Sequence, residues 1–200
     1  MKPRILAGAV ADQEYWDDQF LRGAVTPISW QSAARDLIST ANIVRRVIEQ
    51  RNLEMMEGLK AAKQAGQTQQ KWCLPPVAPA FMLYAFAVEN LAKAILVAKG
   101  TPSTSGLRLA ENIKGHRLRD LVSRTGMVPA ADQNVLLDKM ERFVERGRYP
   151  VQAKPHQQPY ADGISIPTDF SRALSLLEEL ETLLRRVSPC ALGAEALGDY

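Results

Sequence analysis

Residues 77–98 are apolar on nearly every side of the helix that their spacing predicts. Apolar side chains recur there at three- and four-residue steps, which is the repeat of an α-helix. From Phe81 onward, only Glu89, Asn90 and Lys93 are strongly polar. A helix that is apolar all round has to be covered on several sides. We therefore expect this segment to be the central helix of an all-α fold.

The same helical spacing in other segments predicts the neighbours of this helix. Together they indicate an up-and-down, antiparallel bundle of four to five helices over residues 30–187, with no strand ladder. We expect residues 1–29 to form an irregular arm and residues 188–200 a loose tail. Arg51 interrupts the first apolar stripe, so a bend is expected there, and residues 148–167, with four prolines, are expected to be extended. The other helices are expected from about Trp30 to Lys63, His116 to Arg124, Asp132 to Gly147 and Asp169 to Val187.

The composition excludes several classes of protein. A chain of 200 residues with 46% hydrophobic and 24% charged residues is typical of one soluble domain. No uncharged apolar run reaches the roughly 18 residues that cross a bilayer, so we expect a cytoplasmic protein without a membrane segment. Two cysteines and two histidines are too few for a disulfide framework or a well-supplied zinc site. We expect no metal and no cofactor.

Positive charge gathers in the middle of the chain. The net charge is +3, and residues 113–154 carry nine basic and five acidic side chains, which favours an anionic partner there. A helix-turn-helix over residues 113–147 is disfavoured, because Asp138, Glu141 and Glu145 would repel phosphates. The sequence contains no Gly-rich phosphate loop and no Gly-x-Ser-x-Gly elbow, so those two chemistries have no support.

The polar residues of the central helix have two interpretations. Glu89 and Lys93 are four residues apart, so they can form a stabilising ion pair where the helix meets solvent. Alternatively, together with Asn90 they form a polar seam that lines a groove or a dimer cleft, because polar groups on an apolar helix are costly unless satisfied.

The basic residues after the central helix also have two interpretations. Arginine is suited to bidentate capture of phosphate, and a tyrosine ring stacks on bases, so Arg142, Arg146, Arg148 and Tyr149 can form a nucleic-acid patch. In the other interpretation, Arg148 pairs with the buried carboxylate of Glu89 and fixes the following loop. His116 is expected to cap its helix or to pack against the central helix.

Three segments resemble a known family. The helix Phe81–Leu96 resembles the second helix of HEPN domains. Gly115-His116-Arg117-Leu118 is similar to a Gly-His-Asp/Asn-Leu helix opening in bacterial HEPN-like proteins, and Gly147-Arg148-Tyr149-Pro150 is similar to a turn in uncharacterised members. The resemblance covers roughly residues 30–187. It implies an antiparallel helical core, frequent dimerisation, and roles in RNA cleavage, toxin action, nucleotide binding or non-catalytic partnership.

The chain departs from that family at the catalytic motif. HEPN ribonucleases carry an arginine, four to six residues and then a histidine. Here Arg148 and His156 have seven residues between them, with two prolines that prevent a regular helix.

Two functions follow from these observations. The first is a non-catalytic binding or assembly protein, expected to be a homodimer, with RNA, a nucleotide or an operon-encoded protein as possible partners, as in toxin–antitoxin pairs. The second is a metal-independent endoribonuclease, in which Arg148 holds the phosphate while His116 or His156 moves protons. The candidate binding residues of the first are Glu89, Asn90, Lys93, His116, Arg142, Arg146, Arg148 and Tyr149.

Overall fold

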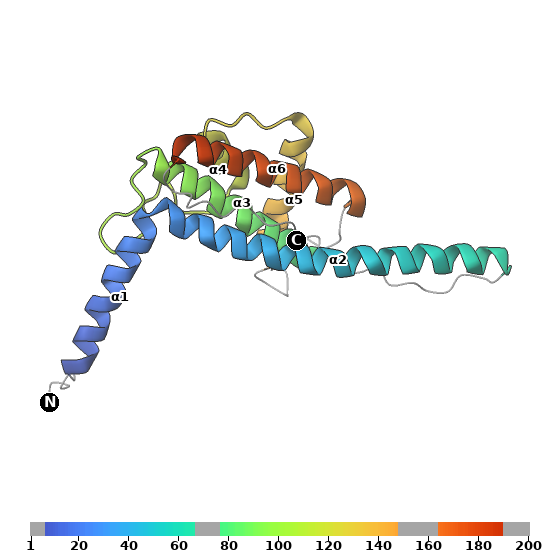
Figure 1. Ribbon diagram of the computed structural model, residues 1–200, viewed down its shortest axis with the longest axis horizontal. Coiled ribbons are helices and arrows are strands. Elements are labelled where there is room, and N and C mark those ends of the chain that lie inside the picture. Colours follow the sequence, from blue (N-terminus) through green and yellow to red (C-terminus); the bar gives the residue numbers. More distant parts are fainter. Residues whose placement is uncertain (1–6, 67–76, 148–163, 190–200) are drawn as a thin grey trace.

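The structure is a computed structural model and describes residues 7–66, 77–147 and 164–189 (Figure 1). Within these ranges the chain forms six α-helices and no strand beyond one isolated bridge, between Thr104 and Leu109. The all-α prediction is confirmed, with more helices than the four to five expected. The helices are α1 (Ala7–Val25), α2 (Pro27–Gln64), α3 (Ala78–Ala98), α4 (Leu118–Arg124), α5 (Ala131–Gly147) and α6 (Ile166–Val187).

The apolar helix α3 lies at the centre of the bundle, as its composition predicts. It packs against α2 on one side and against α4, α5 and α6 on others (Figure 1). By length and composition α3 is the one helix in the described ranges that could cross a membrane, and 72% of its apolar window is buried inside the bundle. The buried central helix of a helical bundle meets the same criterion of length and composition, because it is also long and apolar on most sides.

Alanines let α2 and α3 approach closely. Along α2 the fully buried positions Ala34 and Ala41 are seven residues apart, and Ile48 continues the spacing. Seven residues make two helical turns, so these side chains lie in one row. On α3 the buried small residues include Ala85 and Ala92. Short side chains on both helices leave no room for larger ones, and the α2–α3 pair makes the most extensive contact in the molecule.

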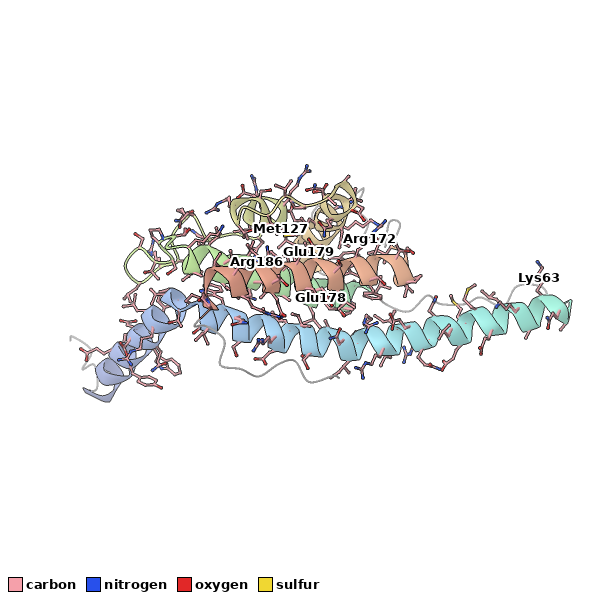
Figure 2. All side chains as sticks on the ribbon, turned by 45° about the horizontal axis from the view of Figure 1, so that its top comes forward. Lys63, Met127, Arg172, Glu178, Glu179 and Arg186 are labelled. Atoms are coloured by element: carbon pink, nitrogen blue, oxygen red, sulfur yellow. The ribbon has the colours of Figure 1, made fainter. Side chains whose placement is uncertain are left out.

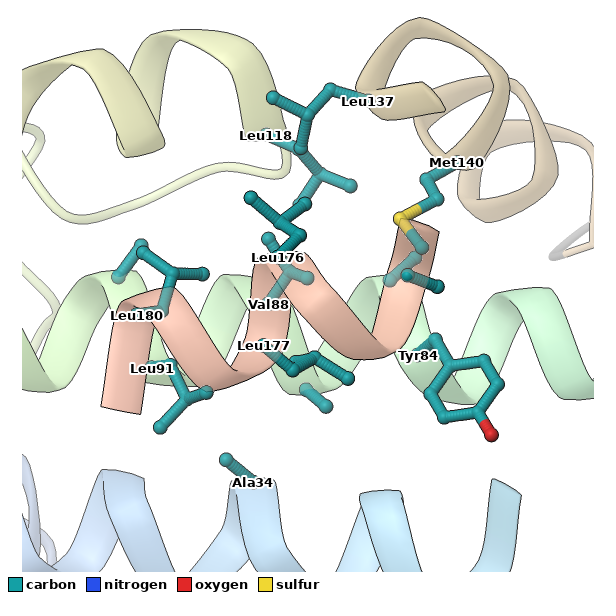
Figure 3. Close-up of a cluster of buried hydrophobic side chains, with 14 of the residues drawn as sticks. Ala34, Tyr84, Val88, Leu91, Leu118, Leu137, Met140, Leu176, Leu177 and Leu180 are labelled. Atoms are coloured by element: carbon teal, nitrogen blue, oxygen red, sulfur yellow. The ribbon is translucent and has the colours of Figure 1, made fainter. Parts of the chain in front are cut away.

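Stacked aromatic rings join α3 to the helices on its other side. The Phe81 ring lies 4.8 Å from that of Phe170 on α6 and 5.7 Å from that of Phe143 on α5, measured between ring centres. Tyr84 meets Phe170 edge-on. Aliphatic side chains complete this core (Figure 3).

The bundle is not strictly up-and-down. Helix α2 runs antiparallel to α3, but α6 runs in the same direction as α3 (Figure 1). Phe170, near the start of α6, stacks on Phe81, near the start of α3, which fixes this direction. The periodicity of a helix is the same in both directions, so spacing alone could not reveal it.

The N-terminal segment is helical where an irregular arm was expected. Helix α1 projects away from the bundle and contacts the start of α2 (Figure 1). The side chain of Trp30 donates from Nε1 to the carbonyl oxygen of Ala24, and Pro27 opens the new helix. Trp16 and Phe20 of α1 are exposed. Because α1 buries so little apolar surface, its sequence shows little of the apolar repeat from which a helix is predicted.

Helix α2 continues without interruption past Arg51, where a bend was expected. Its second part, residues 49–64, extends beyond the bundle (Figure 1). In this projection Leu53, Met56 and Leu59 are 58%, 45% and 38% exposed. The apolar spacing continues there although no other described helix covers it.

The other helix ends lie near their predicted positions. Gly100 and Gly126 follow α3 and α4 with φ of 81° and 83°, a conformation that glycine adopts without steric cost. Helix α6 begins three residues before Asp169, whose Oδ2 accepts a hydrogen bond from the backbone N–H of Ser165. Most of the stretch expected to be extended, residues 148–163, and most of the expected tail lie outside the described residues.

The close approach of α2 to α3 yields a test of core packing. We expect Ala41→Leu to lower the free energy of unfolding by about 2 kcal/mol, because extra methyl groups at a fully buried site force the helices apart. Urea denaturation followed by circular dichroism measures the change. Ala61→Leu makes the same chemical change at an exposed site of α2 and should leave stability within about 0.5 kcal/mol. Equal effects of the two variants would contradict the packing argument.

Candidate functional site

A charged cluster lies where α2, α3 and the loop before α4 meet. Glu89 and Lys93 are on α3, one turn apart, and the Nζ of Lys93 lies 2.6 Å from Oε1 of Glu89. His116 comes from the loop, and its Nδ1 lies 2.7 Å from Oε2 of the same carboxylate. Trp30 of α2 covers the ammonium group, 5.3 Å from its ring centre. We call these four residues the Glu89 cluster.

Glu89 and Lys93 form the ion pair that the first interpretation predicts, but the pair is buried and not at the solvent boundary where it was expected. The side chains of Lys93 and Glu89 are 5% and 7% exposed. A buried carboxylate is tolerated only when charged and hydrogen-bonding groups surround it, and here both of its oxygens have a partner. The Trp30 ring adds a cation–π contact that suits an ammonium removed from water.

His116 connects the cluster to the surface. Its side chain is 38% exposed, and the preceding Gly115 has a φ of 116°, which a residue with a side chain rarely adopts. An ionised carboxylate can only accept a hydrogen bond, so Nδ1 of His116 is the protonated nitrogen that donates to Glu89. This bond fixes the orientation of the ring. The expectation that His116 packs against the central helix is confirmed. The contact is a hydrogen bond to Glu89.

Two of the other predicted site residues, Asn90 and Arg142, have their own partners outside the cluster. The Nδ2 of Asn90 donates to the backbone carbonyl of Phe86 on its own helix. Arg142 is exposed on α5 and donates from Nε to the carbonyl of Asp138. Arg146 belongs to α5, but its side chain lies outside the described part of the chain.

Three of the predicted site residues fall in a stretch that the structure does not describe. Arg148, Tyr149 and His156 all lie within residues 148–163. The predicted pair between Arg148 and Glu89 therefore stays a prediction. The physical need behind it, a partner for the carboxylate of Glu89, is met by Lys93 and His116.

Sequence reasoning missed several polar links between distant segments, of which two join neighbouring helices in the core. The hydroxyl of Tyr84 on α3 donates to Oδ1 of Asn42 on α2, at 2.7 Å. On the far side of α3, the Nζ of Lys139 on α5 lies 2.9 Å from Oδ2 of Asp169, whose side chain is 2% exposed. Each link joins residues that are distant in sequence, so no local spacing of residues predicts it.

A surface hollow of about 480 Å³ lies between the turn after α4 and helix α6. Met127, Glu178, Glu179 and Arg186 are among its lining residues (Figure 2). One Glu179 oxygen already accepts from the side chain of Gln133, at 2.7 Å. In the part of the chain that the structure describes, no group of three or more His, Cys, Asp or Glu side chains is placed to hold a metal ion.

Comparison with known protein families, curated proteins and solved structures finds no match to this chain. The functional argument therefore rests on geometry. The most organised polar arrangement among the described residues is the Glu89 cluster, and its chemistry is that of a neutralised buried carboxylate with a histidine at its outer edge.

The energetics of the Glu89 cluster yield a prediction. We expect Lys93→Met to lower the free energy of unfolding by about 3 kcal/mol, because the buried carboxylate loses its main counter-charge. The double variant Glu89→Leu/Lys93→Met should be more stable than Lys93→Met, since it buries no unpaired charge. Lys114→Met removes an exposed pair with Glu111 and should cost no more than about 0.5 kcal/mol. If the effects of Glu89→Leu and Lys93→Met on the free energy of unfolding simply add in the double variant, Glu89 and Lys93 are not coupled.

The Tyr84 link yields a prediction about alkaline pH. Burial of Tyr84 raises its pKa to about 12, opposed by the nearby Arg45 guanidinium. The ordinary tyrosine pKa of 10.0 applies to the unfolded chain, in which Tyr84 therefore ionises first as pH rises. The stabilising contribution of Tyr84 is present below pH 10 and is lost between pH 10 and 12. Tyrosinate absorbance should show one tyrosine that titrates late and is absent in Tyr84→Phe. A late-titrating group that persists in Tyr84→Phe would contradict the assignment.

Proposed function

We propose that this protein is a non-catalytic binding and assembly protein that makes its contacts through helices projecting from the bundle. The observation that carries the proposal is the second part of α2. Residues 49–64 extend beyond every other described helix and expose Leu53, Met56 and Leu59 (Figure 1). The core is complete without them, so this segment adds nothing to the packing of the described bundle.

A projecting helix of this length needs a reason to persist. Sixteen residues span roughly 24 Å, and isolated helices of such length are marginal in water. Continuity with the packed part of α2 supplies the nucleus, but exposed leucine and methionine side chains gain free energy only when something covers them. A protein partner supplies that cover. The resemblance to HEPN-like proteins, among which non-catalytic partners occur, supports the same proposal.

The Glu89 cluster favours a structural role over a catalytic one. In catalytic sites a carboxylate often orients the histidine and faces no competing cation. Here the ammonium of Lys93 lies 2.6 Å from the same carboxylate and both charged groups are buried, which is the arrangement of a structural ion pair. The cluster instead ties the loop before α4 to the centre of the bundle.

A metal-independent ribonuclease is the second candidate, and the hydrogen bond from His116 to Glu89 is the observation that favours it. In that reaction a histidine takes the proton of the ribose 2′-OH while the oxygen attacks the phosphate. The leaving 5′-oxygen gains a proton, and a cyclic phosphate remains. The other two residues of that proposal, Arg148 and His156, are outside the described ranges.

One experiment separates the two candidates. With chelator present, we expect no cleavage of a panel of single-stranded RNAs, and we expect sedimentation velocity of the full chain to show concentration-dependent association. Thermal shifts with nucleotides and short RNAs report any small anionic ligand. RNA cleavage that leaves a cyclic phosphate and is lost in His116→Ala would establish the ribonuclease. A strict monomer without response to any of these ligands would overturn the assembly proposal.

A further inference from the structure

We infer that the α2 projection, residues 49–64, pairs antiparallel with the same segment of a second copy of this chain, about an axis at Met56. This inference rests on the proposed function and names its partner. It is carried by the distribution of apolar and charged side chains about one position of an exposed helix, together with the length of the projection.

The apolar residues are symmetric about Met56. Leu53 lies three residues before it and Leu59 three residues after it, and all three are exposed. At about 100° per residue, the two leucines lie about 60° to either side of Met56 on the helix surface. When two copies pair antiparallel about this position, Met56 faces Met56, and each Leu53 faces Leu59 of the other copy. Asn52 and Lys60, four residues before and after Met56, lie about 40° from it on the same face, so they also meet across the axis beside the apolar contacts.

The charged residues follow the same symmetry with opposite signs. Glu49 and Lys63 lie seven residues before and after Met56, two helical turns away, and so project from nearly the same side. Antiparallel pairing sets Glu49 of each copy opposite Lys63 of the other. Glu49 already lies 2.8 Å from Arg45 on its own helix, and Lys63 of the other copy, an exposed residue, would become its second neighbour.

The net charge of each half of the projection selects the antiparallel arrangement. Residues 49–57 contain three glutamates and one arginine, a net charge of −2, whereas residues 58–64 contain two lysines and no acid, a net charge of +2. An antiparallel pair sets the negative half against the positive half. A parallel pair would set like charges against each other, which is unfavourable.

The length of the projection fits this register. The bundle ends near Ile48, the last buried position of α2, and Lys63 lies near the far tip of the helix (Figure 2). With Met56 on the axis, position 63 of one copy reaches position 49 of the other. Each tip therefore stops where the bundle of the other copy begins. The face centred on Met56 lies about 80° around the helix from Ile48, on the exposed side of the projection.

Sedimentation of the full chain tests the surface. We expect a monomer–dimer equilibrium in which Leu59→Glu raises the dissociation constant at least tenfold, since it sets a carboxylate against Leu53 of the other copy. Ile43→Glu is the matched control, because Ile43 is 64% exposed on the same helix but on another side. It should leave the dissociation constant within about twofold.

A charge exchange tests the antiparallel register. Lys63→Glu and Glu49→Lys should each raise the dissociation constant about tenfold, because each variant places like charges together twice in the symmetric dimer. The double variant Glu49→Lys/Lys63→Glu restores opposite charges and should return to within about threefold of the original value. A double variant weaker than either single variant would overturn the register.

A crosslink tests the position of the axis. In a Cys73→Ser/Cys190→Ser background, Met56→Cys should form a disulfide-linked dimer on mild oxidation, since the two thiols meet at the axis. Ile43→Cys in the same background should remain uncrosslinked.

The outcomes separate this inference from the function on which it rests. A monomer at every concentration overturns this inference, and it overturns the proposed function as well only if nucleotides and short RNAs also give no thermal shift. A dimer that is insensitive to Leu59→Glu and is not crosslinked through Met56→Cys overturns only the inference, since the chain then assembles elsewhere. A monomer whose melting temperature falls with Leu59→Glu shows that the protein's own chain covers this face, which also overturns the inference.

Discussion

The buried carboxylate of Glu89 is the interaction on which the arrangement of this bundle depends. Helix α3 is covered by other helices on several sides, and an unpaired charge in such a place costs several kcal/mol. Three segments meet that need: Lys93 comes from the next turn of α3, His116 from the loop before α4, and Trp30 from α2 over the ammonium group. The cluster thus links parts of the chain that apolar contact alone would hold less specifically.

Helix α2 has one part that packs against the bundle and a second part, residues 49–64, that projects beyond it (Figure 1). Its first part buries alanines against α3, and small side chains there permit the close approach that the rest of the core builds on. Its second part keeps the helical spacing of apolar residues after the bundle has ended. One continuous helix therefore serves two surfaces. The packed part nucleates the projecting part, so the binding surface proposed for residues 49–64 lies on an already ordered helix, which lowers the conformational entropy that binding would cost.

The same geometry explains why a histidine bonded to a carboxylate does not by itself indicate an enzyme. Glu89 orients His116, as a carboxylate orients a catalytic histidine, but Lys93 shares the negative charge. The pair of Lys139 with Asp169, which joins α5 to α6, is also largely buried and has an anchoring role: Asp169 also accepts from the N–H of Ser165 at the start of α6. Both pairs fix helix ends or loops to the core, which is the task they share.

The sequence by itself determined the helices and the central place of α3, because periodicity and helix-stop glycines are local properties. It also marked Glu89, Lys93 and His116 as residues that need partners. Only the tertiary structure decided which partners they have: His116 and Glu89 are 27 positions apart, and Lys139 and Asp169 are 30 apart. It also decided that α6 runs along α3 and that α1 is helical. Helical spacing is the same in either direction and carries no information about distant contacts, so the partners and the direction of α6 follow from packing. Helix α1 was missed for another reason, since it buries too little apolar surface to show a clear repeat.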